Sequence, residues 1–366
     1  MTSLELLTAA FQFKKTPRLP LMMLGAWPQT LVRWKREGLP DNWAETNFFG
    51  LDGMSGTGVM LGTCFWSPFL PRFEKSVIEN DGQYNVFWDP NGRLMKQHTG
   101  ELDQSVAEYL EFPVKTRNDW DKLKWRMDPD FPGRYADLEN AAQSYKKRGD
   151  CPVSQSLSGP YRLLWHVFGD AGLCYALYDD PEMIHDIMEH WLKLNCAAFD
   201  KVMKELPVNH VTIMEDMSCN TGMMISPAHF NEFLAPYYKS YISHIKKYNS
   251  VFGITVDTDG NVNELIPLLL DCGVNCVQPF EVQAGMDVVA LRRIYGNRLV
   301  IRGGIDKRVL AKTKSDIDRE LDRVLPTFVE TGGYIISLDH QAPPDISLEN
   351  YMYFLEKART YSGTLK

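Results

Sequence analysis

The second half of the chain alternates between short apolar runs and longer stretches in which apolar residues recur every three or four positions. Short apolar runs bounded by turn residues indicate buried strands, and the longer stretches indicate amphipathic helices. The six strands expected in this half cover residues 151–157, 210–216, 251–256, 275–280, 299–303 and 334–338. Strands that alternate with helices form right-handed βαβ units, so this half predicts a parallel sheet.

The first half supplies a short helix at 4–13, two further strands at 19–27 and 58–65, and a helix at 42–48 that Asp41 would cap. Eight strands in this arrangement predict an α/β protein with a (β/α)8 TIM barrel and an N-terminal helical segment. No glycine-rich phosphate-binding fingerprint follows any strand, which argues against a dinucleotide-binding or P-loop sheet.

Residues 73–99 break this rhythm, because apolar and polar residues alternate there around an Asp-Gly pair at 81 and an Asn-Gly pair at 91. Such alternation around Asp-Gly and Asn-Gly turns is typical of β-hairpins. We therefore predict an antiparallel β-hairpin insertion at about 66–130, lying over one end of the barrel. The barrel and its insertion would form a single domain over residues 1–366.

Composition and charge are those of an ordinary globular protein, with 44% hydrophobic and 23% charged residues. A net charge of −8 leaves no basic excess to neutralise the phosphates of a nucleic acid. The N-terminus lacks the basic and apolar regions of a signal peptide, and no apolar run approaches the roughly 18 residues of a membrane span. We expect a cytoplasmic protein that binds neither nucleic acid nor membrane, and a homodimer is compatible with these features.

Carboxylates follow five successive predicted strands, and an imidazole follows the last of them. These residues are Glu215, Asp216, Asp257, Asp259, Glu281, Asp306, Asp339 and His340. The loops after the strands of a β/α barrel meet at one rim, where such enzymes place their chemistry. Helix caps explain two or three acids at such positions, so a structural explanation stays open for part of the set. Acids at all five strand ends, together with His340, favour a cation site or an acid–base site.

Methionine and aromatic residues gather near the strand ends and in the loops that follow. The ones that we single out are Met23, Trp27, Trp165 and Met214. Such residues most often belong to a core, and the alternative is a pocket of rings and thioethers for a flat apolar ligand. Under that alternative these four side chains contact the substrate.

Five segments between Cys151 and Tyr361 carry a resemblance to a known family. They are 158–164, 225–239, 257–261, 303–307 and 339–350. On these segments the chain resembles the uroporphyrinogen decarboxylase superfamily, a β/α-barrel group that also includes zinc-dependent, corrinoid-linked methyltransferases. The segments are fairly specific for the superfamily and say little about the activity within it.

The decarboxylases of this superfamily carry an arginine-rich loop after the first strand that binds the carboxylates of the porphyrinogen. Residues 22–30 occupy that place here, and they contain no arginine; the next one along the chain is Arg33. The tyrosine of their Gly-Pro-like turn falls on His166, and the histidine of their final strand matches His340. The resemblance therefore implies catalytic roles for these two histidines, whereas a substrate with many carboxylates would lack its counter-ions.

The methyltransferases that act on thiols bind zinc with a His-x-Cys-Gly-Asn segment and a later cysteine. The matching segment begins at Asp257 and the later position is His340. The resemblance thus implies a metal held by Asp257, Asp259 and His340, with Glu281 or Glu215 as a further ligand or acid–base partner. Oxygen and imidazole ligands in place of thiolates argue against thiol activation and would make zinc more electrophilic toward oxygen.

We accordingly predict the methyltransferase component of an O-demethylase, which moves a methyl group from a methoxylated aromatic to the cobalt of a corrinoid carried by a partner protein. Zinc or another divalent metal would assist at the ether oxygen. The catalytic residues would be His340, Glu215, Asp339 and His166, and the metal ligands Asp257, Asp259, Glu281 and His340. The alternatives are a metal-free decarboxylase that uses His340 and the acids for proton transfer, and a non-catalytic tetrapyrrole-binding protein.

Overall fold

The computed structural model describes residues 1–99 and 107–361. Seven parallel strands form its main sheet, in the order β1-β6-β7-β10-β11-β12-β13. Their bounds are Ser55–Gly56, Val153–Ser158, Val208–Met214, Gly253–Asp257, Cys276–Gln278, Val300–Arg302 and Tyr334–Ile335. All six strands predicted in the second half are confirmed, with helices between them.

The segment predicted as a strand at 19–27 closes this sheet into a barrel without forming a regular ladder. Leu21 forms a parallel bridge with Ile336, just after β13. On its other side the carbonyl oxygen of Leu21 accepts the backbone N–H of Asp52 at 2.9 Å, shortly before β1. Eight extended segments therefore complete the ring, and the predicted (β/α)8 architecture is confirmed.

The strand predicted at 58–65 is wrong, because the extended segment of this region is β1 and the chain after Gly56 is irregular. Gly58 and Gly62 adopt φ values of +70° and +82°, which interrupt an extended backbone. A Cβ on Gly62 would lie 2.8 Å from the carbonyl oxygen of Trp66, so the turn depends on glycine.

The helix predicted at 42–48 is also wrong, since this segment is a series of turns. Asn47 has a φ of +48°, a conformation that ends any helical continuation. Asp41, predicted as the cap of this helix, instead forms an exposed ion pair with Lys35, with 2.6 Å between carboxylate and ammonium.

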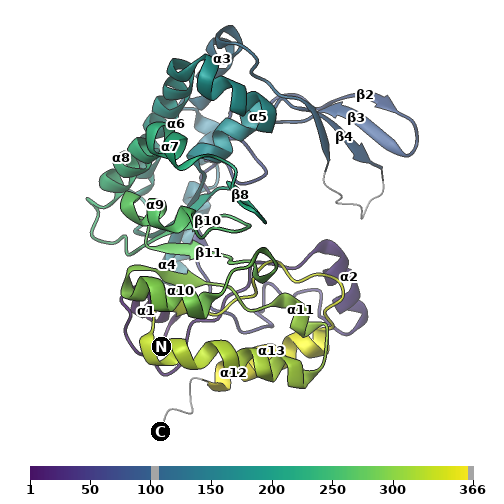
Figure 1. Cartoon of the computed structure of the whole chain (residues 1–366), viewed down its shortest axis with the longest axis vertical. Coiled ribbons are helices and arrows are strands. Elements are labelled where there is room, and N and C mark those ends of the chain that lie inside the picture. The colour runs from purple at the N-terminus through teal and green to yellow at the C-terminus, as the bar shows by residue number, and fades with distance from the viewer. Residues whose placement is uncertain (100–106, 362–366) are drawn as a thin grey trace.

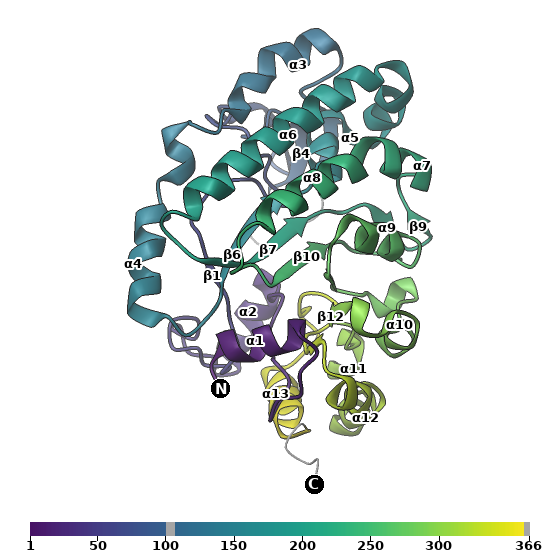
Figure 2. The same cartoon turned by 90° about the vertical axis from the view of Figure 1, so that its left-hand side faces the viewer.

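Helices surround the strands, and Figure 2 shows α6 and α8 running side by side across one part of the sheet. The helices of the barrel are α1 Ser3–Phe11, α2 Pro28–Arg36, α4 Leu138–Arg148, α5 Pro160–Asp179, α6 Pro181–Val202, α7 Pro227–His229, α8 Ala235–Ile245, α9 Leu265–Cys272, α10 Val288–Tyr295, α11 Lys307–Leu310, α12 Lys314–Thr331 and α13 Leu348–Tyr361. The buried residues of α6 recur every three or four positions, as expected for a helix that packs one face on a sheet.

The N-terminal helix α1 covers the base of the barrel, at the N-terminal ends of the strands. Its Leu7 and Phe11 pack with Cys276, Val300 and Ile335, which belong to three neighbouring strands. A capping box between Thr2 and Glu5 starts the helix. The base of the barrel is therefore filled with apolar side chains, so we expect the functional site at the opposite rim.

The predicted antiparallel insertion is present as a four-stranded sheet that projects beside the barrel (Figure 1). Its strands are β2 Ser76–Asn80, β3 Tyr84–Trp88, β4 Leu94–His98 and β5 Glu108–Glu111, and α3 Arg117–Leu123 follows. The rings of Tyr109 and Phe112 pack edge-on against Trp165 of α5, with centroids 5.0 and 5.5 Å away. A Cβ on Gly169, where α5 kinks, would lie 2.2 Å from the Phe112 ring, so glycine permits this contact.

None of the helices in the described part of the chain combines the length and the apolar character needed to cross a bilayer.

Candidate active site at the barrel rim

Three of the predicted metal ligands come together at the rim of the barrel. Asp259 follows β10, Glu281 follows β11 and His340 follows β13. One ligand atom from each lies within 4.8 Å of the others. Nε2 of His340 lies 3.5 Å from Oδ2 of Asp259. All three side chains are partly exposed, so they face the rim opening and not the core.

The loop after β10 is held in place by its backbone. Gly260 has a φ of +81°, and its N–H donates to Oε2 of Glu281 at 3.1 Å. The next N–H, of Asn261, donates at 2.9 Å to the carbonyl oxygen of Cys219. A Cβ on Gly260 would lie 2.7 Å from the carbonyl oxygen of Ser218, so only glycine allows this approach. The hairpin of β8 (Ser218–Cys219) and β9 (Gly222–Met223) thereby fixes the loop that carries Asp259.

Asp339 lies beneath the cluster and connects its loops. Its buried carboxylate accepts the backbone N–H groups of Val282 and Lys307, both at 3.0 Å. Burial raises the pKa of Asp339 above its usual range. The predicted catalytic residue Asp339 therefore lies where it can position the loops after β11 and β12.

Lys307 is a site residue that the sequence analysis did not single out. Its ammonium nitrogen lies 3.8 Å from Oε1 of Glu281 and 3.6 Å from Oδ1 of Asp339. The segment 303–307 was noted for its resemblance to the superfamily, but nothing in that segment alone shows that Lys307 turns toward two carboxylates from other strands.

His340 is biased toward its protonated form by its neighbour. The hydrogen bond to Asp259 raises the pKa of His340, and the charges of Asp259 and Glu281 act in the same direction. A protonated imidazole can donate a proton to a bound oxygen atom, whereas the neutral ring can bind a metal. The same side chain thus suits either kind of chemistry.

Asp257, the fourth predicted ligand, does not join the cluster. Its Oδ2 accepts a hydrogen bond of 2.8 Å from Nε2 of Gln278. Burial raises the pKa of Asp257 to about 6, and the nearby charge of Asp259 adds to this effect. The two aspartates, which the resemblance assigned to the same metal, separate because β10 ends at Asp257 and the chain then turns.

Two carboxylates and one imidazole form a donor set that suits zinc or a similar divalent cation. A catalytic zinc ion takes three protein ligands and keeps one open position. Four-coordinate zinc needs about 3.4 Å between its ligand atoms, given metal–ligand distances of about 2.1 Å. In the rim cluster, by which we mean Asp259, Glu281 and His340, the ligand atoms lie within 4.8 Å of one another, so the partly exposed side chains would have to move closer together to bind one zinc ion.

Glu215 lies away from the rim cluster, in a closed network below the N-terminus of α5. It is only 3% exposed and accepts hydrogen bonds from the N–H groups of Tyr161 (3.3 Å) and Arg162 (2.8 Å) and from the hydroxyl of Tyr238 (2.5 Å). A Cβ on Gly159 would lie 2.1 Å from the Glu215 side chain. Burial raises the pKa of Glu215 to about 7 despite its three donors.

His166 is fully buried and also belongs to a closed network. Nη1 of Arg93 lies 3.2 Å from its Nδ1, and its Nε2 lies 3.4 Å from the carbonyl oxygen of Thr63. Because the guanidinium only donates, His166 carries its hydrogen on Nε2. Burial lowers the pKa of His166 well below its usual range, so the ring is neutral. It joins the inserted sheet to α5.

The four predicted substrate residues lie in different settings. Met214 ends β7 and pairs in register with Asp257, next to the rim. Trp27 precedes α2 and is 43% exposed, whereas Met23 packs against the core. Trp165 is buried against the inserted sheet, with the Arg162 guanidinium 4.0 Å from its ring. Only Met214 lies beside the aspartates in the strand register.

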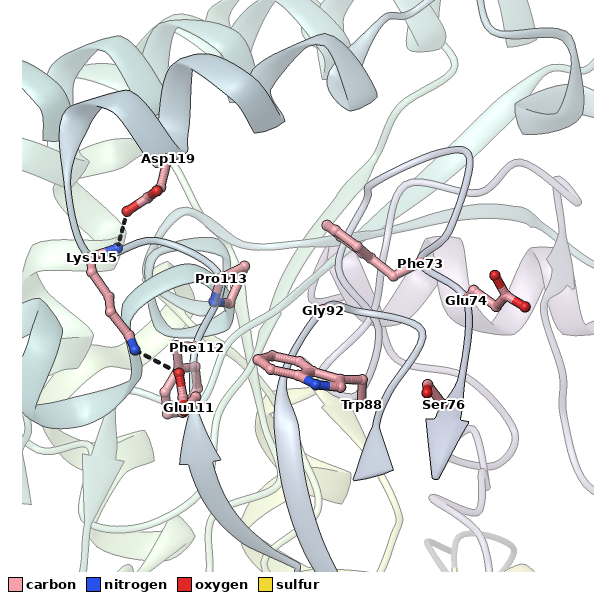
Figure 3. A pocket seen from close by; sticks show the side chains of 10 residues that line it. All are labelled: Phe73, Glu74, Ser76, Trp88, Gly92, Glu111, Phe112, Pro113, Lys115 and Asp119. Atoms are coloured by element: carbon pink, nitrogen blue, oxygen red, sulfur yellow. Dashed lines mark hydrogen bonds and ion pairs between the residues drawn. The ribbon is translucent and has the colours of Figure 1, made fainter. Parts of the chain in front are cut away.

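A separate cavity of about 500 Å³ lies between the inserted sheet and α3 (Figure 3). Its lining residues include Phe73, Trp88 and Phe112, and on one side of it Lys115 pairs with Glu111 at 2.6 Å. None of the rim cluster lines this cavity. It offers aromatic surface without the convergent acid and imidazole groups found at the rim.

Comparison with known proteins agrees with this barrel. Residues 102–361 match the family described as Uroporphyrinogen decarboxylase (URO-D), a match that covers most of the chain. The chain belongs to the uroporphyrinogen decarboxylase family. Curated uroporphyrinogen decarboxylases are similar to it at low identity. The one from Vesicomyosocius okutanii is 22% identical over 255 residues, 68% of this chain and 71% of the relative. The one from Pelodictyon phaeoclathratiforme is 24% identical over 277 residues, 72% and 75% of the two chains.

Solved structures share the fold. A methyltransferase from Methanosarcina mazei matches with a TM-score of 0.66 at 14% identity and covers 99% of each chain. A B12-independent methionine synthase from Shewanella sp. W3-18-1 matches with a TM-score of 0.50 at 11% identity, over 94% of this chain and 96% of that one. Identities this low show the fold alone. Family membership places the chain among enzymes, and its activity must be argued from its own side chains.

Proposed function

We propose that this protein transfers a methyl group from a methoxylated aromatic to the cobalt of a corrinoid carried by a separate protein. The observation that carries this proposal is the rim cluster of two carboxylates and an imidazole at the open end of the barrel. Oxygen and nitrogen ligands suit a cation that binds an oxygen atom of the substrate, whereas a cation that activates a thiol is usually held by thiolates. The methyltransferase of similar fold is consistent with this choice.

The reaction breaks the bond between the methyl carbon and the ether oxygen. Cobalt(I) of the partner's corrinoid would supply the electron pair of the new bond to the methyl carbon and would thereby be oxidised to the cobalt(III) level, while the electron pair of the broken bond would stay on the aryl oxygen. Aryloxide is a poor leaving group, so charge that develops on this oxygen must be stabilised. A divalent cation, when bound, supplies a Lewis acid at that atom.

The side chains at the rim would have different roles in this reaction. Asp259, Glu281 and His340 would hold the cation, and the N–H of Gly260 keeps Glu281 aimed at it. Without a bound cation, protonated His340 would instead offer a proton to the aryl oxygen, a role that its raised pKa favours. Lys307 offsets the negative charge of Glu281 and Asp339. No serine or cysteine nucleophile is needed, because the methyl group goes directly to the partner.

A metal-free decarboxylase is the second candidate, because the curated relatives carry that name. Release of carbon dioxide would then need protons from His340 and the neighbouring acids. Against it, residues 22–30, which lead from the first barrel segment into α2, contain no cationic side chain to bind a substrate with many carboxylates.

The test is a screen of methoxylated aromatics and methylamines with a reduced corrinoid protein, following cobalt methylation by absorbance. We expect methylation with at least one aryl methyl ether, loss of activity with a strong chelator and recovery with zinc. Activity that persists in enzyme shown to be metal-free would overturn the metal part of the proposal. Carbon dioxide release from a carboxylated substrate without any corrinoid protein would favour the decarboxylase.

A further inference from the structure

The inside of the barrel below the rim carries polar side chains where such barrels usually pack branched apolar ones. Cys276, Val300 and Ile335 point inward, because they pack on α1 at the base. Side chains of a strand alternate with period two, so Gln278, Arg302 and the position two after Ile335 share this inner face. That position is Ser337. A polar layer therefore lies between the apolar base and the rim.

The side chains of this layer have buried atoms without partners. Nε2 of Gln278 donates to Asp257, but its Oε1 has no donor within hydrogen-bond distance in the part of the chain that the structure describes. In the same part of the chain, Nε of Arg302 has no hydrogen-bond acceptor and Oγ of Ser337 has no hydrogen-bond partner. Gln278 and Ser337 are 3% and 0% exposed.

Arg302 is the most telling member of the layer. The residue is 8% exposed, and burial lowers the pKa of its guanidinium while the nearby charge of Asp257 acts in the opposite direction. A buried guanidinium without a hydrogen-bonded partner is costly, and native proteins keep such groups where a ligand completes them. Another buried arginine, Arg134, is satisfied by the protein itself: its Nε, Nη1 and Nη2 all donate to backbone carbonyl oxygens, among them those of Met60 and Pro68.

We propose that Arg302 binds the carboxylate of the substrate at the floor of the barrel, so that the enzyme acts on methoxylated aromatic acids. This inference rests on the proposed function and names its substrate class. A guanidinium offers parallel N–H donors that match the two oxygens of a carboxylate, and the hydroxyl of Ser337 provides a further donor. Neutral ring hydroxyls or water can donate to Oε1 of Gln278.

The depth of the site matches such a substrate. Asp257 lies beside Gln278 in the polar layer, and Asp259 of the rim cluster lies two residues further along the same segment. Two residues of chain span at most about 7 Å, which is comparable to the span of a benzene ring with groups at opposite positions. A carboxylate held by Arg302 would therefore leave a methoxy group on the far side of the ring near the rim cluster.

Calorimetry without any corrinoid protein tests the inference. The probes are 4-methoxybenzoate, benzoate and the uncharged 4-methoxyphenol, each titrated into wild type, Arg302→Met, Arg302→Lys and the control Arg308→Met. Arg308 follows the same strand but pairs with Asp306 at the rim, so its removal controls for a general loss of positive charge. We expect affinity for both benzoates to fall about 100-fold in Arg302→Met and less in Arg302→Lys, with 4-methoxyphenol and the control nearly unchanged.

Thermal unfolding separates binding from folding. Because Arg302 has no hydrogen-bonded partner in the described protein, Arg302→Met should unfold at the wild-type temperature or higher without ligand, and only the wild type should gain stability from 4-methoxybenzoate. Equal benzoate binding by wild type and Arg302→Met would overturn the inference, and so would a marked loss of stability in that variant. Benzoate binding through Arg302 without cobalt methylation would instead contradict the proposed function, so the two proposals fail separately.

Discussion

Glu215 and the rim cluster both place carboxylates at the ends of barrel strands, yet their surroundings differ completely. Both oxygens of Glu215 are used by backbone N–H groups and a tyrosine hydroxyl, and the side chain is buried. Asp259 and Glu281 are partly exposed and face each other and His340, with like charges close together. Because all hydrogen-bonding atoms of Glu215 are used within the protein, we assign it a structural role. At the rim, ligand atoms of partly exposed side chains lie close together, so we expect the chemistry there.

The largest effect on activity is expected when a member of the rim cluster is removed. Asp259→Ala and His340→Ala should each lower kcat/KM for cobalt methylation by roughly 10³-fold, because each removes a cation ligand and a partner of the other. The free energy of unfolding should change by less than about 0.5 kcal/mol, since both side chains are partly exposed. Methylation assays measure the change in kcat/KM, and urea denaturation measures the change in the free energy of unfolding. A large loss of stability with intact activity would show that the rim cluster is structural and not catalytic.

The second prediction concerns Glu215. Glu215→Ala should lower the free energy of unfolding by about 4 kcal/mol, because it leaves two N–H groups and the Tyr238 hydroxyl buried without partners. Urea denaturation at neutral pH measures this change. A variant of nearly wild-type stability that has lost all methylation would show that Glu215 acts in the chemistry and not in the scaffold.

The third prediction follows from the pKa of Glu215, which burial raises from 4.5 to about 7. The folded state then binds more protons than the unfolded state between these values, so this contribution to stability is complete below pH 4.5 and is lost as pH rises through 7. Between pH 5 and pH 8 the wild type should lose roughly 2–3 kcal/mol more than Glu215→Gln, which does not titrate. If urea denaturation shows the same pH dependence of the free energy of unfolding for the wild type and Glu215→Gln, this prediction is wrong.

The smallest effect is expected at a rim carboxylate outside the cluster. Asp306 caps α11 by accepting the N–H of Arg308 at 3.0 Å and pairs with the guanidinium of that residue. Asp306→Asn keeps the cap and should change kcat/KM less than about twofold. A loss comparable to that of Asp259→Ala would extend the site to the loop after β12.

Much of this architecture follows from local patterns. The strands of the second half are short apolar runs between amphipathic helices, and the strand ends therefore fall close to where the sequence places them. The closing segment around Leu21 lies within the strand predicted at 19–27. The two-residue strand β1 was missed, because its extended shape is fixed by its partner at Pro152 and not by a pattern of its own.

The candidate site was predictable as a set of strand-end acids but not as a geometry. Asp257 and Asp259 look equivalent in the sequence, and only the Gln278 hydrogen bond and the turn at Gly260 separate them. His166 resembled a catalytic position because nothing local shows that Arg93, far away in the inserted sheet, will contact it. Lys307 and Arg302 were missed for the same reason, since their importance depends on what neighbouring strands leave charged or unpaired.

The helix at the base of the barrel has a kinetic consequence. Because α1, a helix of nine residues, fills that end, a substrate bound at Arg302 would have to enter through the rim, the same side that the proposed corrinoid partner would face to collect the methyl group. The aromatic acid would then bind before the partner arrives, and the demethylated product would leave after the partner departs. Turnover should follow an ordered sequence, and a large excess of corrinoid protein should slow it by blocking the entrance.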